Sequence, residues 1–266
     1  MGPSDESWEL YGSLAPLYDA FYRTMDYRGQ ADLYARLHRE LSPVGGRRLL
    51  DLCCGTGRHA ARLSERGYRA VGYDQSRAML RAAARRLAAV VRGDHRKIAL
   101  RGPFDLVTCV GHSLLQVQTP VSLRETLAQI FALLAPGGVF LCDMIDRRAG
   151  LDSREHENFD EELGLRYGIQ WLWDGSSESI TTVVRMGIHQ GGEEMQAEDR
   201  HRLLALEVSQ LVRELETVGF DVHTYEDDVI EDDAESDAES DAQSDPAPVP
   251  LDPDSRHALL ACVRPA

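Results

Sequence analysis

The chain has 266 residues, of which 43% are apolar, and this suits one domain with a substantial core and a smaller addition. No run of eighteen apolar residues occurs, and the N-terminus lacks the basic and apolar regions of a secretory signal, so we expect neither a transmembrane helix nor a leader. The net charge is −15, but residues 226–245 hold eleven acids and no base, so the rest of the chain is only mildly acidic. Because no basic stripe is present to neutralise phosphates, a nucleic-acid partner is disfavoured.

The five cysteines predict a reducing environment. Their number is odd, two are adjacent, and their spacing forms neither a disulfide framework nor a zinc site: Cys53, Cys54, Cys109, Cys142 and Cys262. We therefore expect a cytoplasmic protein in which the thiols are mostly small buried apolar groups.

Two helices are predicted first, over 14–26 and 28–41, and strands and helices alternate after them. The predicted strands are 47–52, 69–73, a short one near 90–93, 104–110 and 138–143, and the predicted helices between them are 57–66, 76–90 and 120–135. Alternation at this spacing is typical of a parallel, doubly wound sheet.

The pattern changes after residue 150. Alternating segments at 165–174, 178–190 and 193–206 are separated by Asp-Gly and Gly-Gly turns, which predicts a three-stranded antiparallel insert. A helix over 207–218 and strands over 220–226 and 256–263 follow. Between those last strands, the acidic and proline-rich stretch at about 228–250 is predicted to be a disordered loop.

The most informative motif is DLCCGTGRHA at 51–60, where an acid ends an apolar strand and glycines lead into a helix. Glycines in such a turn bring backbone N–H groups close to a ligand. The spacing of Gly55, Gly57 and Ala60 also satisfies the dinucleotide pattern. However, the carboxylate of Asp51 would repel a pyrophosphate and attract an ammonium or sulfonium group, which favours S-adenosylmethionine over NAD.

Together with three further segments, this motif resembles the class I S-adenosylmethionine-dependent methyltransferases. The segments are AVGYDQSRAML (70–80), FDLVTCVGHSLL (104–115) and LLAPGGVFLCD (133–143), which occur in the order of that family. The resemblance covers roughly residues 45–145. It implies a seven-stranded Rossmann-like sheet with the antiparallel β insert as a cap, as in small-molecule N-methyltransferases.

The cofactor contacts are predicted at the ends of the strands. The resemblance implies that Asp51 holds the methionine amino group, and Asp74 can accept both ribose hydroxyls, although either acid could instead cap a helix. The resemblance implies contacts from Gln75 and Met79 to the adenosine and from Asp94 to the adenine. The complete predicted cofactor set is Tyr11, Tyr18, Asp51, Cys53, Gly55, Gly57, Asp74, Gln75, Met79, Asp94 and Val110.

The methyl group should face the residues that follow the strand over 104–110. Relatives usually have a bulky aromatic residue where Gly111 stands, and Asn, Asp or Ser where His112 stands. His112 could orient a nucleophile or accept its proton, and a structural histidine is the alternative. Tyr18 is the second predicted catalytic residue, because related enzymes close an aromatic N-terminal segment over the cofactor. Gln116 is a weaker candidate, at a position where relatives often have Tyr or His.

The insert should determine the acceptor, because function depends on sites rather than on the shared core. Its candidate residues are Trp171, Trp173, Arg185, His201 and Arg202. The predicted division is a helical lid at 1–44, a cofactor core at 45–150, the cap at 151–206 and a C-terminal part of the core at 207–266.

The predicted function is methyl transfer from S-adenosylmethionine to a small molecule, with an amine as the acceptor. No membrane or nucleic-acid partner is expected. Two alternatives are a catalytically silent cofactor-binding protein whose acidic loop docks a basic partner, and an NAD-dependent oxidoreductase. Asp51 and the Pro-Gly-Gly sequence before an apolar strand argue against the oxidoreductase.

Overall fold

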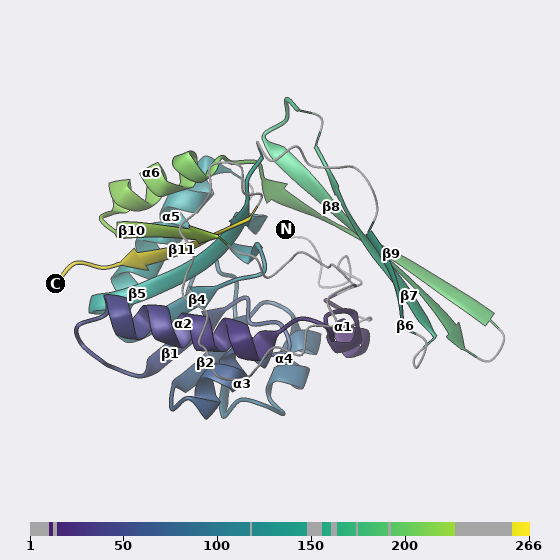
Figure 1. The fold of residues 1–266 in the computed structure, drawn as a ribbon, viewed down its shortest axis with the longest axis horizontal. Coiled ribbons are helices and arrows are strands. Elements are labelled where there is room, and N and C mark those ends of the chain that lie inside the picture. The colour runs from purple at the N-terminus through teal and green to yellow at the C-terminus, as the bar shows by residue number, and fades with distance from the viewer. Residues whose placement is uncertain are drawn as a thin grey trace.

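The computed structural model describes residues 11–12, 15–117, 119–147, 156–160, 164–173, 175–190, 193–226 and 257–266. Two sheets organise these residues, one of seven strands and one of four (Figure 1). Among the described residues, no helix has both the length and the apolar character needed to cross a membrane.

The seven-stranded sheet is doubly wound, as the sequence predicts. Its strands are β1 (Arg48–Leu52), β2 (Arg69–Asp74), β3 (Ala89–Arg92), β4 (Phe104–Cys109), β5 (Leu134–Ile145), β10 (Asp221–Glu226) and β11 (His257–Val263). Their order is β10-β11-β5-β4-β1-β2-β3, and all neighbouring pairs are parallel except those that involve β11. β1 and β5 are buried along nearly their whole length, which explains their continuous apolar runs.

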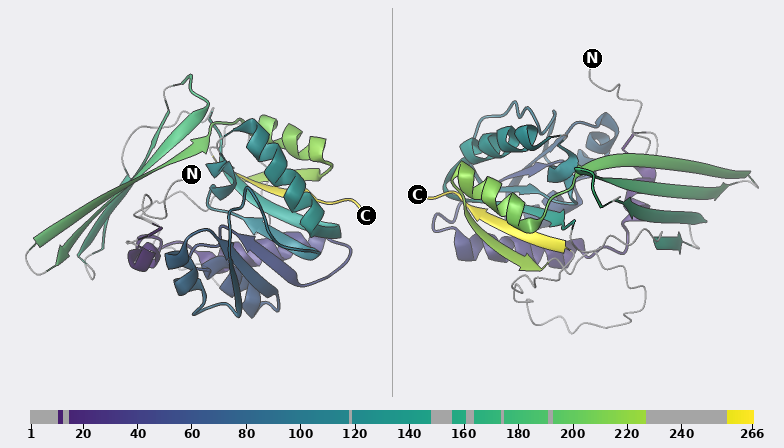
Figure 2. Two further views of the ribbon diagram at one scale, coloured as in Figure 1. Left: turned by 180° about the vertical axis from the view of Figure 1, so that it is seen from behind. Right: turned by 90° about the horizontal axis from the view of Figure 1, so that it is seen from above.

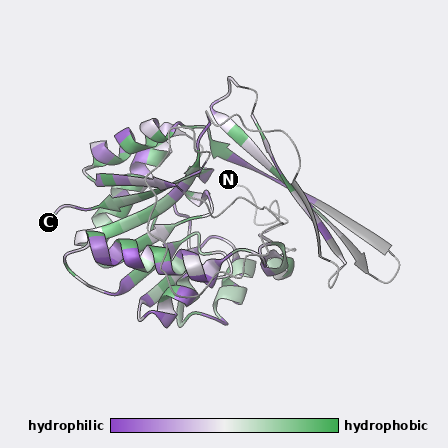
Figure 3. Cartoon of the chain, viewed as in Figure 1, coloured by the Kyte–Doolittle hydropathy of each residue, from purple (hydrophilic) through white to green (hydrophobic). Residues whose placement is uncertain are grey.

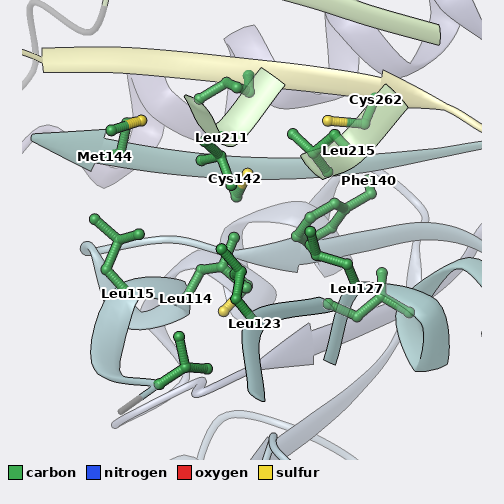
Figure 4. Close-up of a cluster of buried hydrophobic side chains, with 14 of the residues drawn as sticks. Leu114, Leu115, Leu123, Leu127, Phe140, Cys142, Met144, Leu211, Leu215 and Cys262 are labelled. Atoms are coloured by element: carbon green, nitrogen blue, oxygen red, sulfur yellow. The ribbon is translucent and has the colours of Figure 1, made fainter. Parts of the chain in front are cut away.

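Helices cover both faces of this sheet, as two apolar clusters and Figure 2 show. One face carries α2 (Tyr27–Leu41), α3 (Arg58–Glu65) and α4 (Arg77–Ala83), and the other carries the short helix η1 (Ser113–Gln116), α5 (Pro120–Leu133) and α6 (Val208–Val218). In Figure 4, leucines of α5 and α6 gather around Phe140 and Cys142 of β5. In Figure 3, hydrophobic residues lie along the strands of the core, whereas hydrophilic and hydrophobic residues alternate along α2.

The first helix is shorter than predicted. α1 spans Ala15–Phe21, not 14–26, because the side chain of Asp26 accepts hydrogen bonds from the amides of Arg28 and Gly29 and so caps α2. β5 is longer than predicted, since it begins at Leu134 and includes the Pro-Gly-Gly sequence. There Gly137 adopts a positive φ of 75°.

The antiparallel insert is confirmed, with one strand more than the sequence predicts. β7 (Leu165–Leu172), β8 (Ser179–Gln190) and β9 (Glu193–Leu204) form the expected meander, and β6 (His156–Asp160) pairs with β7. This cap sheet projects from the core, with α1 between it and the core helices (Figures 1 and 2).

The base of the cap sheet is joined to the core by hydrogen bonds from two backbone amides. The amide of Arg147 donates to the carbonyl of Leu206 at 3.0 Å, and the amide of Val208 donates to the buried carboxylate of Asp146 at 3.0 Å. Ile180 and Leu203 belong to the same apolar cluster as β5. The acidic segment at about 228–250 lies outside the described residues, and the strands that flank it, β10 and β11, pair directly.

Candidate active site at the carboxyl end of the sheet

The site lies where the winding of the sheet reverses, between β1 and β4. The chain leaves β1 toward β2 on one side, while β4 lies on the other, and such a reversal opens a crevice at the carboxyl ends of the strands. Among the described residues, the two non-glycine residues with positive φ are Cys53 after β1 and His112 after β4, both at 55°. Strained backbone of this kind clusters at functional sites.

Asp51 lies at the carboxyl end of β1, where the winding of the sheet reverses. Its side chain is buried, with 2% of the residue exposed, and accepts a hydrogen bond of 2.7 Å from the hydroxyl of Thr108 on β4. Burial raises the pKa of Asp51 to about 7, the bond from Thr108 opposes the rise, and the nearby carboxylate of Asp74 adds to it. A positively charged ligand would compensate this buried carboxylate.

The glycine loop joins β1 to α3. Gly55 has a φ of 53°, and its amide donates to Asp74 at 2.9 Å. A Cβ added at Gly55 would meet only the ring of Tyr18, at 3.9 Å, so the position is open toward the crevice. At Gly57, an added Cβ would instead come within 3.0 Å of Leu87, so this glycine permits packing of the loop against the core.

Asp74 ends β2, as predicted, and holds the loop together. Its two carboxylate oxygens accept from the amides of Gly55 and Ser76, at 2.9 and 2.8 Å, and burial raises its pKa. Of the two residues predicted beside the adenosine, Gln75 is exposed and Met79, in the first turn of α4, is fully buried.

Three further predicted cofactor residues follow other strands. Asp94, after β3, accepts hydrogen bonds from Nε and Nη2 of Arg96 at 2.7–3.0 Å. Burial raises the pKa of Asp94, but the bonds from Arg96 outweigh it, so the pKa is lowered. Cys53 is half-buried, and its thiol contacts the thiol of Cys109 and the imidazole of His95. Val110 is buried at the end of β4.

The N-terminal segment reaches the glycine loop through two tyrosines. The rings of Tyr11 and Tyr18 lie 6.0 Å apart, and the carbonyl of Tyr11 accepts a hydrogen bond from the hydroxyl of Ser76. Asp19, one residue beyond Tyr18, accepts a bond of 2.6 Å from Thr56 inside the loop. The structure therefore brings the two predicted tyrosines together with Gly55 and Asp74.

His112 stands on the β4 side. The amides of Gly111 and His112 donate to the buried carboxylate of Asp143, at 2.7 and 2.8 Å, which holds this strained turn in place. The imidazole stacks on that of His257, with 5.4 Å between the ring centres, and its buried Nε2 atom has no hydrogen-bond partner among the residues that the structure describes. Burial lowers the pKa of His112 to about 4, so the ring is neutral near pH 7.

The cap sheet contributes one of its candidate residues to this region. The ring of His201 lies 5.3 Å from that of Tyr11, whose hydroxyl is hydrogen-bonded to Gln116. The other candidates lie elsewhere: Arg202 binds Ser179 at the surface, and Arg185 binds Glu198. Trp171 and Trp173 pack at the edge of the apolar core cluster.

Sequence reasoning missed four supporting residues: Asp19, Thr108, Asp143 and Asp199. Asp143 had a readable signal, because it is an acid at the carboxyl end of β5, next to β4, just as Asp51 is at the end of β1. The position of Asp199 two residues before His201 places both on one face of β9, but nothing in the sequence indicates that this face is turned inward. The roles of Thr108 and Asp19 follow only from their hydrogen-bond partners, Asp51 and Thr56, and the sequence does not reveal these contacts.

The fold and this crevice define a Rossmann-like protein with carboxylates and aromatic rings where a nucleoside ligand of positive charge would bind. Residues 49–138 match the methyltransferase domain family. The Bacillus subtilis protein YqeM is 26% identical over 80% of this chain and 87% of its own length. The dTDP-4-amino-2,3,4,6-tetradeoxy-D-glucose N,N-dimethyltransferase of Saccharopolyspora spinosa is 35% identical, over 47% of this chain and about half of its own length, 51%.

Solved structures agree in fold. The sugar N-methyltransferase KedS8 from Streptoalloteichus superposes with a TM-score of 0.76 over 94% of this chain and 93% of its own, at 23% identity. Residues 49–138 therefore form a methyltransferase domain, and the similar proteins and structures are S-adenosylmethionine-dependent methyltransferases by their names. The residues present fit this cofactor, since the open position at Gly55 and the buried carboxylate of Asp51 suit a cationic amino-acid group close to the loop.

Proposed function

We propose that the protein methylates a nitrogen atom of a small-molecule amine. The observation that supports this proposal is the set of buried groups on the β4 side of the crevice. It comprises the carboxylate of Asp199 and the imidazoles of His112 and His201. Such groups suit an acceptor that arrives as an ammonium and must react as a neutral amine. The similarity to an amino-sugar dimethyltransferase supports the same class of acceptor.

The cofactor residues are proposed as predicted. Asp51 would bind the methionine amino group, Asp74 the ribose hydroxyls and Asp94 the adenine, while Tyr11 and Tyr18 would cover the cofactor. An aromatic ring attracts a desolvated sulfonium by about 1–2 kcal/mol through cation–π interaction. When bound, S-adenosylmethionine supplies an electrophilic methyl carbon on that sulfonium.

The contribution of the protein would be orientation and exclusion of water. Holding two reactants in line can supply about 7–11 kcal/mol in well-aligned systems. His112, neutral near pH 7 because burial lowers its pKa to about 4, would accept a hydrogen bond from the amine and orient it. The lid at 1–44 and the cap at 151–206 would close the crevice, and the cap would select the acceptor.

The test is methyl transfer from labelled S-adenosylmethionine to a panel of acceptors. The panel contains glycine, a dTDP-linked amino sugar, the matching dTDP-sugar with a hydroxyl in place of the amine, and a basic peptide. We expect label on an amine and none on the hydroxyl analogue. Label on the hydroxyl compound would contradict the proposal, and cofactor binding without turnover on any acceptor would favour a silent binding protein.

A further inference from the structure

The cap sheet carries a buried acid–imidazole pair that the cofactor site does not use. Asp199 and His201 are two residues apart on β9 and therefore share a face of the sheet. They are 5% and 6% exposed, and Oδ2 of Asp199 lies 3.8 Å from Nδ1 of His201. This distance is too long for a hydrogen bond but short enough for strong attraction once the ring is protonated.

The pair faces the crevice through Tyr11. The ring of Tyr11 lies against His201, its hydroxyl is hydrogen-bonded to Gln116 of η1, and its carbonyl accepts from Ser76 beside Asp74. The charges of Asp74 and Asp199 both raise the pKa of Tyr11, so both carboxylates lie near it. One residue, Tyr11, therefore links the two regions, since its main-chain carbonyl contacts Ser76 beside the proposed ribose acid and its ring contacts His201 on β9. In addition, η1 itself packs against β9.

The surroundings of His112 do not favour a protonated imidazole. Burial alone accounts for its low pKa, and its ring faces another imidazole, that of His257, while the Asp143 carboxylate is occupied by backbone amides. An imidazolium at His112 would gain little stabilisation from these groups. At His201, burial also lowers the pKa, but Asp199 opposes the shift.

We propose that His201 accepts the proton of the acceptor ammonium and that Asp199 is a positioning residue that stabilises the resulting imidazolium. This assignment rests on the proposed amine methylation. The N–H bond of the ammonium breaks, its electron pair stays on nitrogen as the lone pair that attacks, and the proton bonds to the imidazole. With Nδ1 turned to Asp199, the proton enters at Nε2, and the imidazolium returns it to water after turnover.

The charged and titratable groups around His201 determine the expected pH dependence. Asp199 on β9 favours protonation, Tyr11 from the N-terminal segment remains neutral because burial raises its pKa, and the β8 neighbours Thr182 and Val184 carry no charge. Since the pKa of His201 lies below its usual 6.5, kcat/KM should fall when the pH drops below 6.5 and reaches this lowered pKa. Above it, the imidazole is neutral and ready to accept a proton.

The first experiment needs no acceptor. Sinefungin carries an amino group in place of the sulfonium methyl of the cofactor, whereas S-adenosylhomocysteine has no group there. Their dissociation constants are measured by calorimetry for the wild type, Asp199→Asn and His201→Gln. Asp199→Asn should weaken sinefungin about tenfold or more relative to S-adenosylhomocysteine, the usual effect of losing a charged partner.

A matched control lies between the two residues. Arg200 points away from the pair and binds Glu198 at the surface, so Arg200→Gln should keep the wild-type ratio of the two constants. Retained binding of S-adenosylhomocysteine shows that each variant is folded. A ratio unchanged in Asp199→Asn would overturn the assignment, whatever the acceptor panel shows.

The second experiment is the pH profile of kcat/KM with the panel amine, glycine or the dTDP-linked amino sugar, that the wild type methylates. His201→Gln should lose about a hundredfold in rate and the acid limb with it, while Asp199→Asn should move that limb to lower pH. His112→Gln should keep the limb. A limb that survives in His201→Gln and disappears in His112→Gln would reverse the assignment, and absence of turnover on every amine would contradict the proposed function alone.

Discussion

The two sides of the crevice are built in different ways. The cofactor side consists of the β1–α3 loop and the end of β2, where Gly55, Asp74 and Ser76 lie within some twenty residues and are tied by backbone hydrogen bonds. The acceptor side is assembled from Tyr11, Gln116, Asp199 and His201, which come from the N-terminal segment, η1 and the cap. The first is a local motif, and the second exists only in the folded chain.

This difference predicts where function is sensitive. Backbone amides and glycines carry the cofactor side, so single changes there should alter cofactor affinity. Side chains from distant segments carry the acceptor side, so changes there should alter turnover while the cofactor still binds. Each of the following experiments tests that separation.

The largest effect is expected for Asp74→Ala. It removes an acceptor of the Gly55 and Ser76 amides and the proposed partner of the ribose hydroxyls. Affinity for S-adenosylhomocysteine should fall by about 1.5–3 kcal/mol, or roughly ten- to 150-fold, measured by calorimetry. Asp94→Ala is the control and should cost less, because Asp94 is already bound by Arg96. Equal losses in both variants would mean that the β2 end has no special role.

The pH dependence of cofactor affinity tests Asp51. The pKa of Asp51 is about 7 in the folded protein against an ordinary 3.8. Between pH 3.8 and 7 this carboxyl is therefore ionised in the unfolded chain but still protonated in the folded one, so folding stability decreases as the pH rises. Above pH 7 the loss of folding stability is complete. A cationic ligand favours the ionised form, so binding releases a proton. Affinity should rise about tenfold between pH 6 and 8 and then level off.

In Asp51→Asn this rise should be absent, and its affinity should be nearly constant over the same range. Calorimetry in buffers of different ionisation enthalpy would count the released proton directly. A rise that persists in the asparagine variant would assign the titration to another group, of which Asp143, with a pKa raised by burial to about 6, is the nearest candidate.

Tyr11→Phe should separate the two sides most sharply. The ring that lies against His201 is kept, and only the hydroxyl that bonds to Gln116 is lost. A neutral hydrogen bond contributes about 0.5–1.5 kcal/mol, so kcat/KM for the methylated amine should fall roughly two- to tenfold. Because the ring that is proposed to cover the cofactor is kept, affinity for S-adenosylhomocysteine should stay unchanged. A parallel loss of cofactor affinity would show that the two sides are not separable at this residue.

The smallest effect is expected away from both sides. β10 and β11 pair from Asp221–Val263 to Glu226–Ala258, so replacing residues 228–250 with a short glycine-containing turn leaves this ladder intact. The melting temperature should change by only a few degrees, with some gain from the removed self-repulsion of acids. Cofactor affinity and turnover should be retained. Loss of turnover with folding intact would give the acidic segment a catalytic role.

Local patterns predicted most of the core. The buried strands β1, β4 and β5 have continuous apolar runs, and the glycine C-cap of α6 ends that helix at Val218, with a φ of 112° at Gly219. β6 was not predicted, because His156–Asp160 is short and polar and forms a strand only through its pairing with β7. The bounds of α1 were wrong because the cap at Asp26 competes with helix continuation.

The sequence by itself determined the sheet, the methyltransferase domain at 49–138 and the positions of Asp51 and Asp74 at the ends of β1 and β2, because these follow from periodicity and from neighbours in the chain. Only the tertiary structure decided that Asp143 holds the turn of His112 and that His201 meets Tyr11. A carboxylate that accepts from an amide 31 residues away, or two tilted rings in contact across 190 residues, leave no periodic trace in the sequence. Such contacts arise when the cap and the N-terminal segment pack against the core and bury polar groups that then need partners.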